Sequence, residues 1–215
     1  MYLQQERICG MQNTSVSHWE SIFKARPDAE HSWYQPNPEA SLTMLKQCGL
    51  TTDARVIDVG AGDSKLVDEL LERGYRNISV LDISATALDR TKRRLGSRGD
   101  HLHWIVSDVL DFEPQERFDA WHDRAAFHFL LTETDVRRYA DLVTKAIRPG
   151  GCLVIGTFSL KGPKNCSGLE IRQYDSDQLS RVFGDSFILI QSFQDTHITP
   201  AGVHQEFVFC RFRRK

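Results

Sequence analysis

Residues 54–64 read ARVIDVGAGDS, and this stretch decides the fold. Its first part is a short run of apolar and β-branched residues that ends at Gly60, which is typical of a buried strand. Gly60 and Gly62 lack a Cβ atom, so a ligand can approach this turn closely. In open α/β sheets, ligands bind at the carboxyl ends of the strands, where such turns lie. One Gly-x-Gly pair alone is weak evidence, because tight turns also need glycine.

After this turn, apolar runs alternate with amphipathic stretches. Strands are expected at residues 77–83, 101–109, 117–123 and 152–158. Helices are expected at residues 63–73, 84–95 and 134–147, with Gly74 ending the first and Ser84 as the N-cap of the second. Arg148–Gly151 contains a proline and two glycines, so we expect a turn there. Alternating strands and helices form βαβ units and a parallel sheet.

The two ends of the chain depart from this alternation. Residues 186–198 and 203–212 both have the pattern of strands, and only Thr-Pro-Ala-Gly separates them, so they are expected to pair antiparallel. Near the N-terminus, Trp19, Ile22 and Phe23 can share one face of a helix, and a second helix is expected at 38–48. We therefore predict that residues 1–50 form a helical cap over the sheet.

The charge balance limits the possible partners. Lysine and arginine number 27 and aspartate and glutamate 29, which gives a formal net charge of −2. A nucleic-acid or anionic-membrane partner needs a basic excess, so neither is expected. The basic clusters at 90–98 and 211–215 are interpreted as solvated surface. No apolar run approaches the roughly 18 residues of a membrane span, and the first twenty residues lack a signal-peptide core.

The cysteines are odd in number and widely spaced: Cys9, Cys48, Cys152, Cys166 and Cys210. No Cys-x-x-Cys pair occurs, although structural zinc usually requires such closely spaced ligands. This pattern favours free thiols in a reducing compartment. We therefore predict a cytoplasmic protein that has no bound metal.

The glycine turn discriminates among ligands. The third glycine of the dinucleotide pattern falls on Lys65, and the Gly-Lys-Ser/Thr of a phosphate-binding loop is absent. Asp58, just before the turn, would repel a pyrophosphate but suits a ligand that carries an ammonium group. Asp82, at the end of the second strand, can accept the hydroxyls of a ribose, or it can cap the next helix. Asp108, at the end of the third, can accept from an adenine amine, or it can lie in a solvated turn.

These pieces together resemble the class I S-adenosylmethionine-dependent methyltransferases. The matching segments are VIDVGAGDS, VLDIS, SDVLDF, FDAWHDRAAFHFL and RPGG, followed by the antiparallel C-terminal strands. The resemblance implies one α/β domain over residues 1–215. Its core, residues 54–213, is expected to be a Rossmann-like, seven-stranded, mostly parallel sheet with an antiparallel C-terminal hairpin. Ser64 departs from the pattern, because many members have a third glycine there.

The resemblance also assigns a cofactor site for S-adenosylmethionine, which becomes S-adenosylhomocysteine. Asp58, Gly60 and Gly62 are expected to hold the methionine end. Asp82 and Ile83 are expected at the ribose, Asp108 and Val109 at the adenine, and the backbone of His122 below the sulfur. Trp33 and Tyr34, in a segment similar to that of thiopurine-type methyltransferases, are expected to close over the cofactor. Alternatively, they pack as part of the cap.

Residues 121–129, WHDRAAFHF, are the expected acceptor region, because charged and aromatic side chains follow the fourth strand directly. The thiopurine-type enzymes have a similar aspartate-arginine pair. His122, Asp123 and His128 are candidate bases, although a histidine beside an apolar run is often structural. Arg124 is a candidate for binding an anionic acceptor or the cofactor carboxylate. Alternatively, it pairs with Asp123 or Glu133.

We predict a methyltransferase that acts on a small molecule. The alternatives are a protein-lysine methyltransferase and a cofactor-binding protein without catalysis. An enclosed pocket under Trp33 and Tyr34 would favour a small acceptor, whereas a large open acidic or aromatic groove would favour a protein. Residues 159–173 form an irregular loop that is expected over the site. Cys166 in this loop and Tyr174, which follows the loop, are possible substrate contacts. The sequence leaves the acceptor atom and the oligomeric state open.

Overall fold

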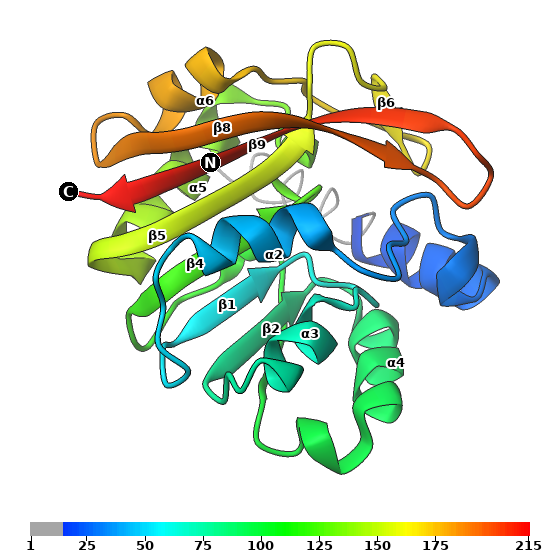
Figure 1. Ribbon diagram of the computed structural model, residues 1–215. Coiled ribbons are helices and arrows are strands. Elements are labelled where there is room, and N and C mark those ends of the chain that lie inside the picture. The colour runs from blue at the N-terminus through cyan, green and yellow to red at the C-terminus, as the bar shows by residue number, and fades with distance from the viewer. Residues whose placement is uncertain (1–14) are drawn as a thin grey trace, which may run out of the picture.

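The computed structural model describes residues 15–215 and is built around a seven-stranded sheet in the order β3-β2-β1-β4-β5-β9-β8 (Figure 1). The five parallel strands are β1 (Val56–Val59), β2 (Ile78–Asp82), β3 (His103–Val106), β4 (Phe118–Arg124) and β5 (Ile147–Phe158). The antiparallel strands are β8 (Phe187–Ile198) and β9 (His204–Arg214). The expected mostly parallel sheet with its antiparallel C-terminal hairpin is confirmed.

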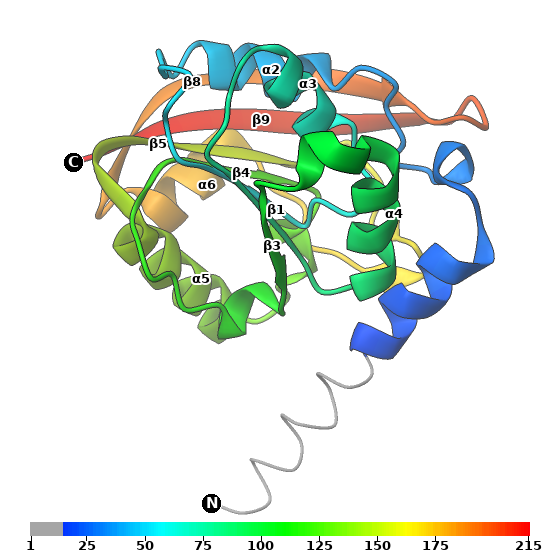
Figure 2. The ribbon, with the colours of Figure 1, turned by 90° about the horizontal axis from the view of Figure 1, so that it is seen from below.

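Helices cover both faces of the sheet (Figure 2). One face packs against α2 (Glu39–Lys46), α3 (Leu66–Glu72) and α4 (Ala85–Leu95), and the other packs against α5 (Glu133–Ala146) and α6 (Ser176–Phe183). Alternation along β1 explains the two layers, because Val56 belongs to one apolar core and Ile57 to the other. Both side chains are fully buried. Because the strands are parallel, their carboxyl ends lie along one edge of the sheet, and the helices on both faces leave that edge open to a ligand.

Short elements complete the chain. They are the 3-10 helices η1 (Asp28–Glu30), η2 (Gly96–Gly99), η3 (Val109–Asp111) and η4 (Phe127–Phe129), and a small hairpin of β6 (Asn165–Cys166) and β7 (Leu169–Glu170). The helix boundaries follow the expected signals. Ser84 caps α4 by accepting from the Ala87 N–H, and Gly74 follows α3 with a φ of 90°.

The prediction of a separate turn at Arg148–Gly151 is wrong. These residues belong to β5, which is irregular here: Phe118 pairs with Ile147, but Ala120 pairs with Cys152. The extra residues on β5 bulge from the ladder, and Gly150 adopts a φ of 78°. The proline and glycines therefore bend the start of a long strand instead of ending the preceding helix with a turn.

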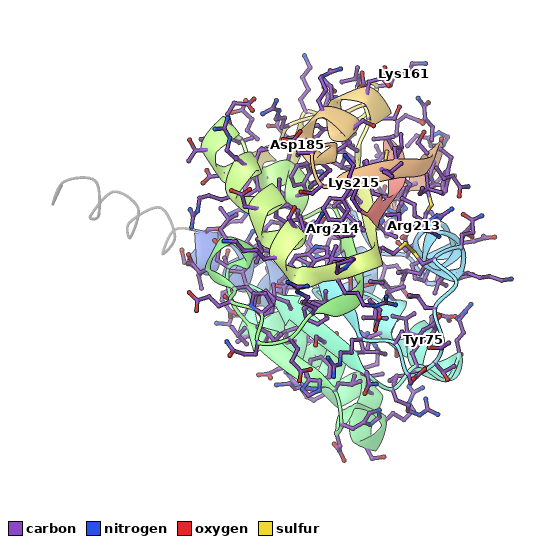
Figure 3. All side chains as sticks on the ribbon, turned by 90° about the vertical axis from the view of Figure 1, so that its left-hand side faces the viewer. Tyr75, Lys161, Asp185, Arg213, Arg214 and Lys215 are labelled. Carbon is purple, nitrogen blue, oxygen red and sulfur yellow. A yellow bond between two sulfur atoms is a disulfide. The ribbon has the colours of Figure 1, made fainter. Side chains whose placement is uncertain are left out.

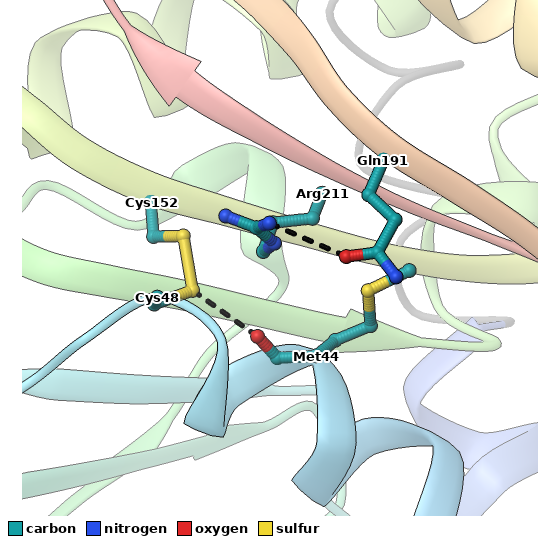
Figure 4. Close-up of a disulfide and its surroundings, with 5 residues drawn as sticks. All are labelled: Met44, Cys48, Cys152, Gln191 and Arg211. Carbon is teal, nitrogen blue, oxygen red and sulfur yellow. Dashed lines mark hydrogen bonds between the residues drawn. A yellow bond between two sulfur atoms is a disulfide. The ribbon is translucent and has the colours of Figure 1, made fainter.

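The expectation of free thiols is wrong for two cysteines. Cys48, just after α2, forms a disulfide with Cys152 in β5 (Figure 4). The two residues are 104 positions apart, so spacing along the chain gave no sign of the pairing. Cys166 and Cys210 are free and buried, and Cys9 lies outside the described residues. A cytoplasmic location stays a prediction, and its argument from free thiols no longer applies to this pair.

The basic C-terminal cluster is only partly solvated. The labelled Arg213, Arg214 and Lys215 gather at the end of β9 (Figure 3). Lys215 donates from Nζ to the Gly184 carbonyl at 2.6 Å, which caps the end of α6. Arg211 is buried and donates from Nη2 to Gln191 Oε1 at 3.3 Å near the disulfide (Figure 4). The prediction of solvated surface is therefore wrong for Arg211, because β9 lies between β5 and β8.

The N-terminal cap contains a helix over residues 15–25, followed by η1 and α2. Glu20 fastens this helix to α4: its Oε1 accepts from Ser84 Oγ at 2.8 Å and from the Thr86 N–H at 3.0 Å. Burial opposes the charge, but hydrogen bonds from Thr86, Ser84 and Lys24 outweigh it and lower the pKa of Glu20 to about 2. The cap is thus held at the amino end of α4, beside the ends of the parallel strands.

Candidate active site

A pocket of about 460 Å³ lies at the carboxyl ends of the parallel strands, between the sheet and the N-terminal cap. This volume is within the range of small-molecule sites. Every residue expected to contact the cofactor lines it, namely Trp33, Tyr34, Asp58, Gly60, Gly62, Asp82, Ile83, Asp108, Val109 and His122. The structure therefore brings together the residues that the sequence placed at separate strand ends.

The turn after β1 requires both glycines. Gly60 has a φ of 62° and Gly62 a φ of 53°, in the left-handed region that favours glycine. A Cβ at Gly60 would lie 2.5 Å from the Cβ of Ala126, and one at Gly62 would lie 3.1 Å from Phe23 Cζ. The glycines thus allow the turn, the segment after β4 and the cap helix to approach each other closely, and they also leave the backbone open to the pocket.

Asp82 is fixed by the backbone around it. Its Oδ2 accepts from the Gly62 N–H and its Oδ1 from the Ser84 N–H, both at 2.8 Å. Burial raises the pKa of Asp82 to about 7, although these two N–H donors lower it. Each carboxylate oxygen has two acceptor positions, so both can accept a further hydrogen bond from a ligand. The carboxylate is therefore oriented, and it remains able to bind hydroxyl groups.

Asp108 has a similar arrangement after β3. Its side chain caps η3 by accepting from the Leu110 N–H at 2.9 Å, and burial raises the pKa of its carboxyl group. The apolar side chains of Ile83 and Val109 line the same end of the pocket. A carboxylate beside apolar walls suits a flat ring that carries an amine.

His122 lies between Asp58 and Ser41. Its Nδ1 is 2.7 Å from Asp58 Oδ1, and its Nε2 is 2.9 Å from Ser41 Oγ. Both ring nitrogens are thus occupied, so the imidazole is held in place and does not point freely at the pocket. Asp58 Oδ2 is buried and has no hydrogen-bond partner among the described residues. That oxygen provides an acceptor for a ligand ammonium group.

The other two candidate bases do not line the pocket. Asp123 is fully buried and accepts from the Ala126 and Phe127 N–H groups and from the Tyr139 hydroxyl. His128 is fully buried between the rings of Phe129 and Phe158, and burial, followed by the charge of Arg124, lowers its pKa to about 3. The geometry corrects the interpretation of these two residues: Asp123 braces the turn after β4, and His128 packs in the core.

Arg124 ends β4 and lines the pocket. Its Nη1 donates to the Trp33 carbonyl at 3.2 Å, and its guanidinium lies 4.7 Å from the ring centre of Phe207. Burial lowers its pKa to about 10, so the group stays charged near neutral pH. Among residues 15–215, Arg124 forms no ion pair with Asp123 or Glu133, which was its alternative role. Glu133 pairs with Arg172 instead.

An aromatic cluster forms the cap side of the pocket. Trp33 stacks on His31 at 4.4 Å between ring centres, and its Nε1 donates to Asp63 Oδ1 at 3.4 Å. Trp19 meets Phe129 edge to face at 5.2 Å. Sequence reasoning assigned Trp19 to a helix but missed its place in the pocket, although its helical face with Phe23 was a usable signal. It also missed Ser41, because one serine in a helix carries no such signal.

Of the two residues expected from the loop after β5, Cys166 lines the pocket and Tyr174 does not. Tyr174 is buried against Phe127, with 5.1 Å between ring centres. Burial raises the pKa of the Cys166 thiol. The β6–β7 hairpin therefore contributes one side chain to the pocket wall.

Two findings concern residues 15–215 as a whole. No helix there is long and apolar enough to cross a membrane. No group of three or more His, Cys, Asp or Glu side chains is placed to hold a metal ion in that range.

Part of the chain is similar to known methyltransferases. Residues 56–151 match the family model described as a methyltransferase domain. The eEF1A lysine and N-terminal methyltransferase of Mus musculus is 28% identical over 122 residues, which are 56% of this chain and 17% of that protein. Nodulation protein S of Rhizobium tropici is 30% identical over 104 residues, which are 48% of this chain and 43% of that protein. The chain thus spans less than half the length of each of these two relatives.

A solved structure has the same fold over almost the whole chain. It is the 1,6-didemethyltoxoflavin-N1-methyltransferase of Burkholderia thailandensis, with bound 1,6-didemethyltoxoflavin and S-adenosylhomocysteine. The TM-score is 0.69 and the identity 19%, and the match covers 98% of this chain and 90% of that chain. At this identity the likeness is one of fold.

Proposed function

We propose that this chain, whose residues 56–151 match the methyltransferase-domain model, transfers a methyl group from S-adenosylmethionine to a small-molecule acceptor. One observation carries the proposal. Asp58 lies in β1, Asp82 ends the adjacent β2 and Asp108 follows β3, and all three line one pocket. A carboxylate can accept hydrogen bonds from an ammonium group, from hydroxyls or from an amine. The three together therefore match a ligand with an ammonium group, a ribose and an adenine.

The unsatisfied acceptors of the pocket fit that cofactor. Asp58 Oδ2 is buried without a partner, which suits the ammonium group of the methionine portion. The oriented carboxylate of Asp82 suits the two ribose hydroxyls. Asp108, beside Ile83 and Val109, suits the adenine ring and its exocyclic amine.

When bound, S-adenosylmethionine supplies an electrophilic methyl group, and its sulfur keeps the bonding electron pair as the acceptor lone pair attacks the methyl carbon in line. The protein's task is to bind, orient and exclude water. Trp33 and Tyr34 line the cap side of the pocket and present aromatic faces to a cation. His122 is engaged at both ring nitrogens, so the arrangement favours an acceptor that reaches the pocket already in its nucleophilic form.

A small acceptor is favoured over a protein lysine. Aromatic side chains of the cap line the pocket, and its volume of about 460 Å³ has to hold both the cofactor and the acceptor. The charged guanidinium of Arg124 in its wall would repel a lysine ammonium. The toxoflavin enzyme, which has the same fold, is named for a small substrate, whereas the eEF1A relatives are named for a protein. A non-catalytic cofactor-binding protein would lack room beside the cofactor.

Calorimetry with S-adenosylhomocysteine tests the cofactor assignment, and binding in the micromolar range is expected. No binding at millimolar ligand would refute it. A second experiment incubates the protein with labelled S-adenosylmethionine and either a metabolite extract or a protein extract. Label is expected in small molecules. Label found only in protein would favour the lysine alternative, and binding without any transfer would favour the non-catalytic one.

A further inference from the structure

We propose that Arg124 recognises the methyl acceptor, and that this acceptor is a small aromatic molecule that carries a carboxylate group. This inference rests on the proposed methyltransferase function, because it names the acceptor class of the same pocket. Four properties of the described residues lead to it: unused hydrogen-bond donors, position along the sheet, the surrounding rings and the local charge.

The guanidinium of Arg124 has donors that no acceptor satisfies. Nη1 donates to the Trp33 carbonyl, but Nε and Nη2 are buried and have no hydrogen-bond partner in the described part of the chain. Buried donors without acceptors are unfavourable, particularly on a charged group. A carboxylate offers two oxygens in the geometry of the guanidinium fork, so it can satisfy two donors at once. Arg124 therefore has the unmet bonding capacity of an anion site.

Arg124 lies on the opposite side of the pocket from the residues assigned to adenosine. Asp82 ends β2 and Asp108 follows β3, which are the two outer strands on one side of β1. Arg124 ends β4 on the other side and packs on Phe207 of β9, beyond β5. Cys166 of the β6–β7 hairpin also lines the pocket and interacts electrostatically with Arg124. This placement assigns Arg124 to the acceptor end.

The surrounding side chains favour a flat, apolar acceptor. Trp33, Tyr34 and Phe129 all line the pocket, and Trp19 packs against Phe129. Aromatic rings prefer offset or edge-to-face contact with other rings. Because a cavity of about 460 Å³ must also hold the cofactor, the acceptor has to be small.

Arg124 also carries a charge that no ion pair neutralises in the described part of the chain, although the charges of Asp195 and Asp58 attract it. Burial and the charge of Arg124 lower the pKa values of His128 and His197, so both histidines are neutral near pH 7. Burial raises the pKa of Asp195. This residue attracts Arg124, but the two side chains do not form an ion pair. The Cys166 thiol has a raised pKa and therefore stays neutral. An incoming carboxylate thus meets a cation that has no bound counter-ion among the described residues.

The main rival role for Arg124 is binding of the cofactor's own carboxylate. Two ligands separate the roles: S-adenosylhomocysteine has that carboxylate, and 5′-methylthioadenosine lacks the amino-acid portion. If Arg124 serves the acceptor, Arg124→Gln should change the affinity for either ligand by less than threefold. A tenfold loss for S-adenosylhomocysteine alone would overturn the proposal.

The acceptor site is probed with benzoate and with its neutral counterpart benzamide, on both the free and the S-adenosylhomocysteine-loaded protein. The wild type should bind benzoate at least tenfold more tightly than benzamide. Arg124→Gln should abolish this preference, and Arg124→Lys should keep part of it because the charge remains without the fork. Arg172→Gln is the matched control, because Arg172 also lies over a ring, that of Tyr174, but outside the pocket wall. Thermal unfolding checks that each variant is folded.

Equal binding of benzoate and benzamide to the wild type would overturn the inference, as would a preference that survives in Arg124→Gln. Failure of the proposed function is recognised separately, because the wild type would then either not bind S-adenosylhomocysteine or not transfer label to a small molecule. Since benzoate binding needs no turnover, the titration on the free protein still decides the role of Arg124 in that case.

Discussion

The two ends of the pocket are built in opposite ways. At the end proposed for adenosine, carboxylates are held by backbone N–H groups: Asp82 by that of Ser84, two residues away, and that of Gly62, 20 residues away, and Asp108 by that of Leu110, two residues away. At the acceptor end, side chains are held by distant segments. Arg124 bonds to Trp33, 91 positions away, and His122 to Ser41, 81 positions away.

In one case the orientation of a side chain depends on its own strand and turn, and in the other it depends on tertiary contacts. A carboxylate fixed by neighbouring N–H groups keeps its orientation as long as its strand and turn form. A side chain fixed by the cap keeps its orientation only while the cap is docked. Mutations that loosen the cap should therefore disturb the acceptor end more than the adenosine end, and the following experiments compare the two directly.

The largest expected effect comes from removing the Cys48–Cys152 disulfide, which ties the end of α2 to β5. The double variant Cys48→Ser/Cys152→Ser should lose about 2–4 kcal/mol of unfolding free energy, because its unfolded chain is less restricted. Urea unfolding of both proteins, with and without reductant, measures this. Reductant should weaken the wild type and leave the variant unchanged. Equal stability of the two oxidised proteins would contradict the prediction.

Replacing Asp82 by alanine should break the adenosine end alone. Affinity for S-adenosylhomocysteine should fall by about 1.5–3 kcal/mol, the value of hydrogen bonds to a charged group. Calorimetry measures this, with Asp89→Ala, on the exposed face of α4, as the control. The preference for benzoate over benzamide in the free protein should persist. Unchanged nucleoside affinity would refute the ribose assignment.

The raised pKa of Asp82, about 7 against an ordinary 3.8, predicts a pH dependence. The folded state holds the proton more tightly than the unfolded state, so the contribution of this group to stability declines as pH rises from 3.8 to about 7. Ligand affinity should change in the other direction, because only the carboxylate accepts both ribose hydroxyls.

Between pH 8 and pH 6, affinity for S-adenosylhomocysteine should therefore weaken by up to about 1.4 kcal/mol, the equivalent of one pKa unit. Calorimetry at both pH values measures the change in the wild type and in Asp82→Asn, which cannot titrate at this position. The same weakening in both proteins would assign the dependence to another group.

The smallest expected effect comes from Glu20→Gln, which removes the charge that fastens the cap helix to α4. Stability should fall by about 0.5–1.5 kcal/mol, as for loss of a typical hydrogen bond. Because Trp19 and Phe23 lie on the same helix and line the pocket, benzoate affinity should fall more than affinity for 5′-methylthioadenosine. Glu113→Gln, at an exposed position, is the control. An equal fall for both ligands would contradict the comparison.

Sequence reasoning worked where the signal was local. The strand periodicity, the glycine turn and the N-cap at Ser84 all depend on neighbouring residues, and the structure confirms each. It failed where contacts were long-range. Asp123 and His128 stand in a segment rich in charged and aromatic residues, but Asp123 in β4 bonds to Tyr139, and His128 in η4 packs in the core. No local pattern distinguishes these outcomes from a pocket position.

The sequence by itself determined the order of strands and helices and the positions of Asp82 and Asp108 at the ends of two strands, because hydrophobic period and turn chemistry act over a few residues. Only the tertiary structure decided the acceptor end. The approach of α2 to β5 brings Cys48 to Cys152, its approach to β4 brings Ser41 to His122, and the packing of β9 beside β5 brings Phe207 under Arg124. Those contacts depend on how apolar faces of distant segments pack together, so they form only when the whole sheet and its cap are assembled.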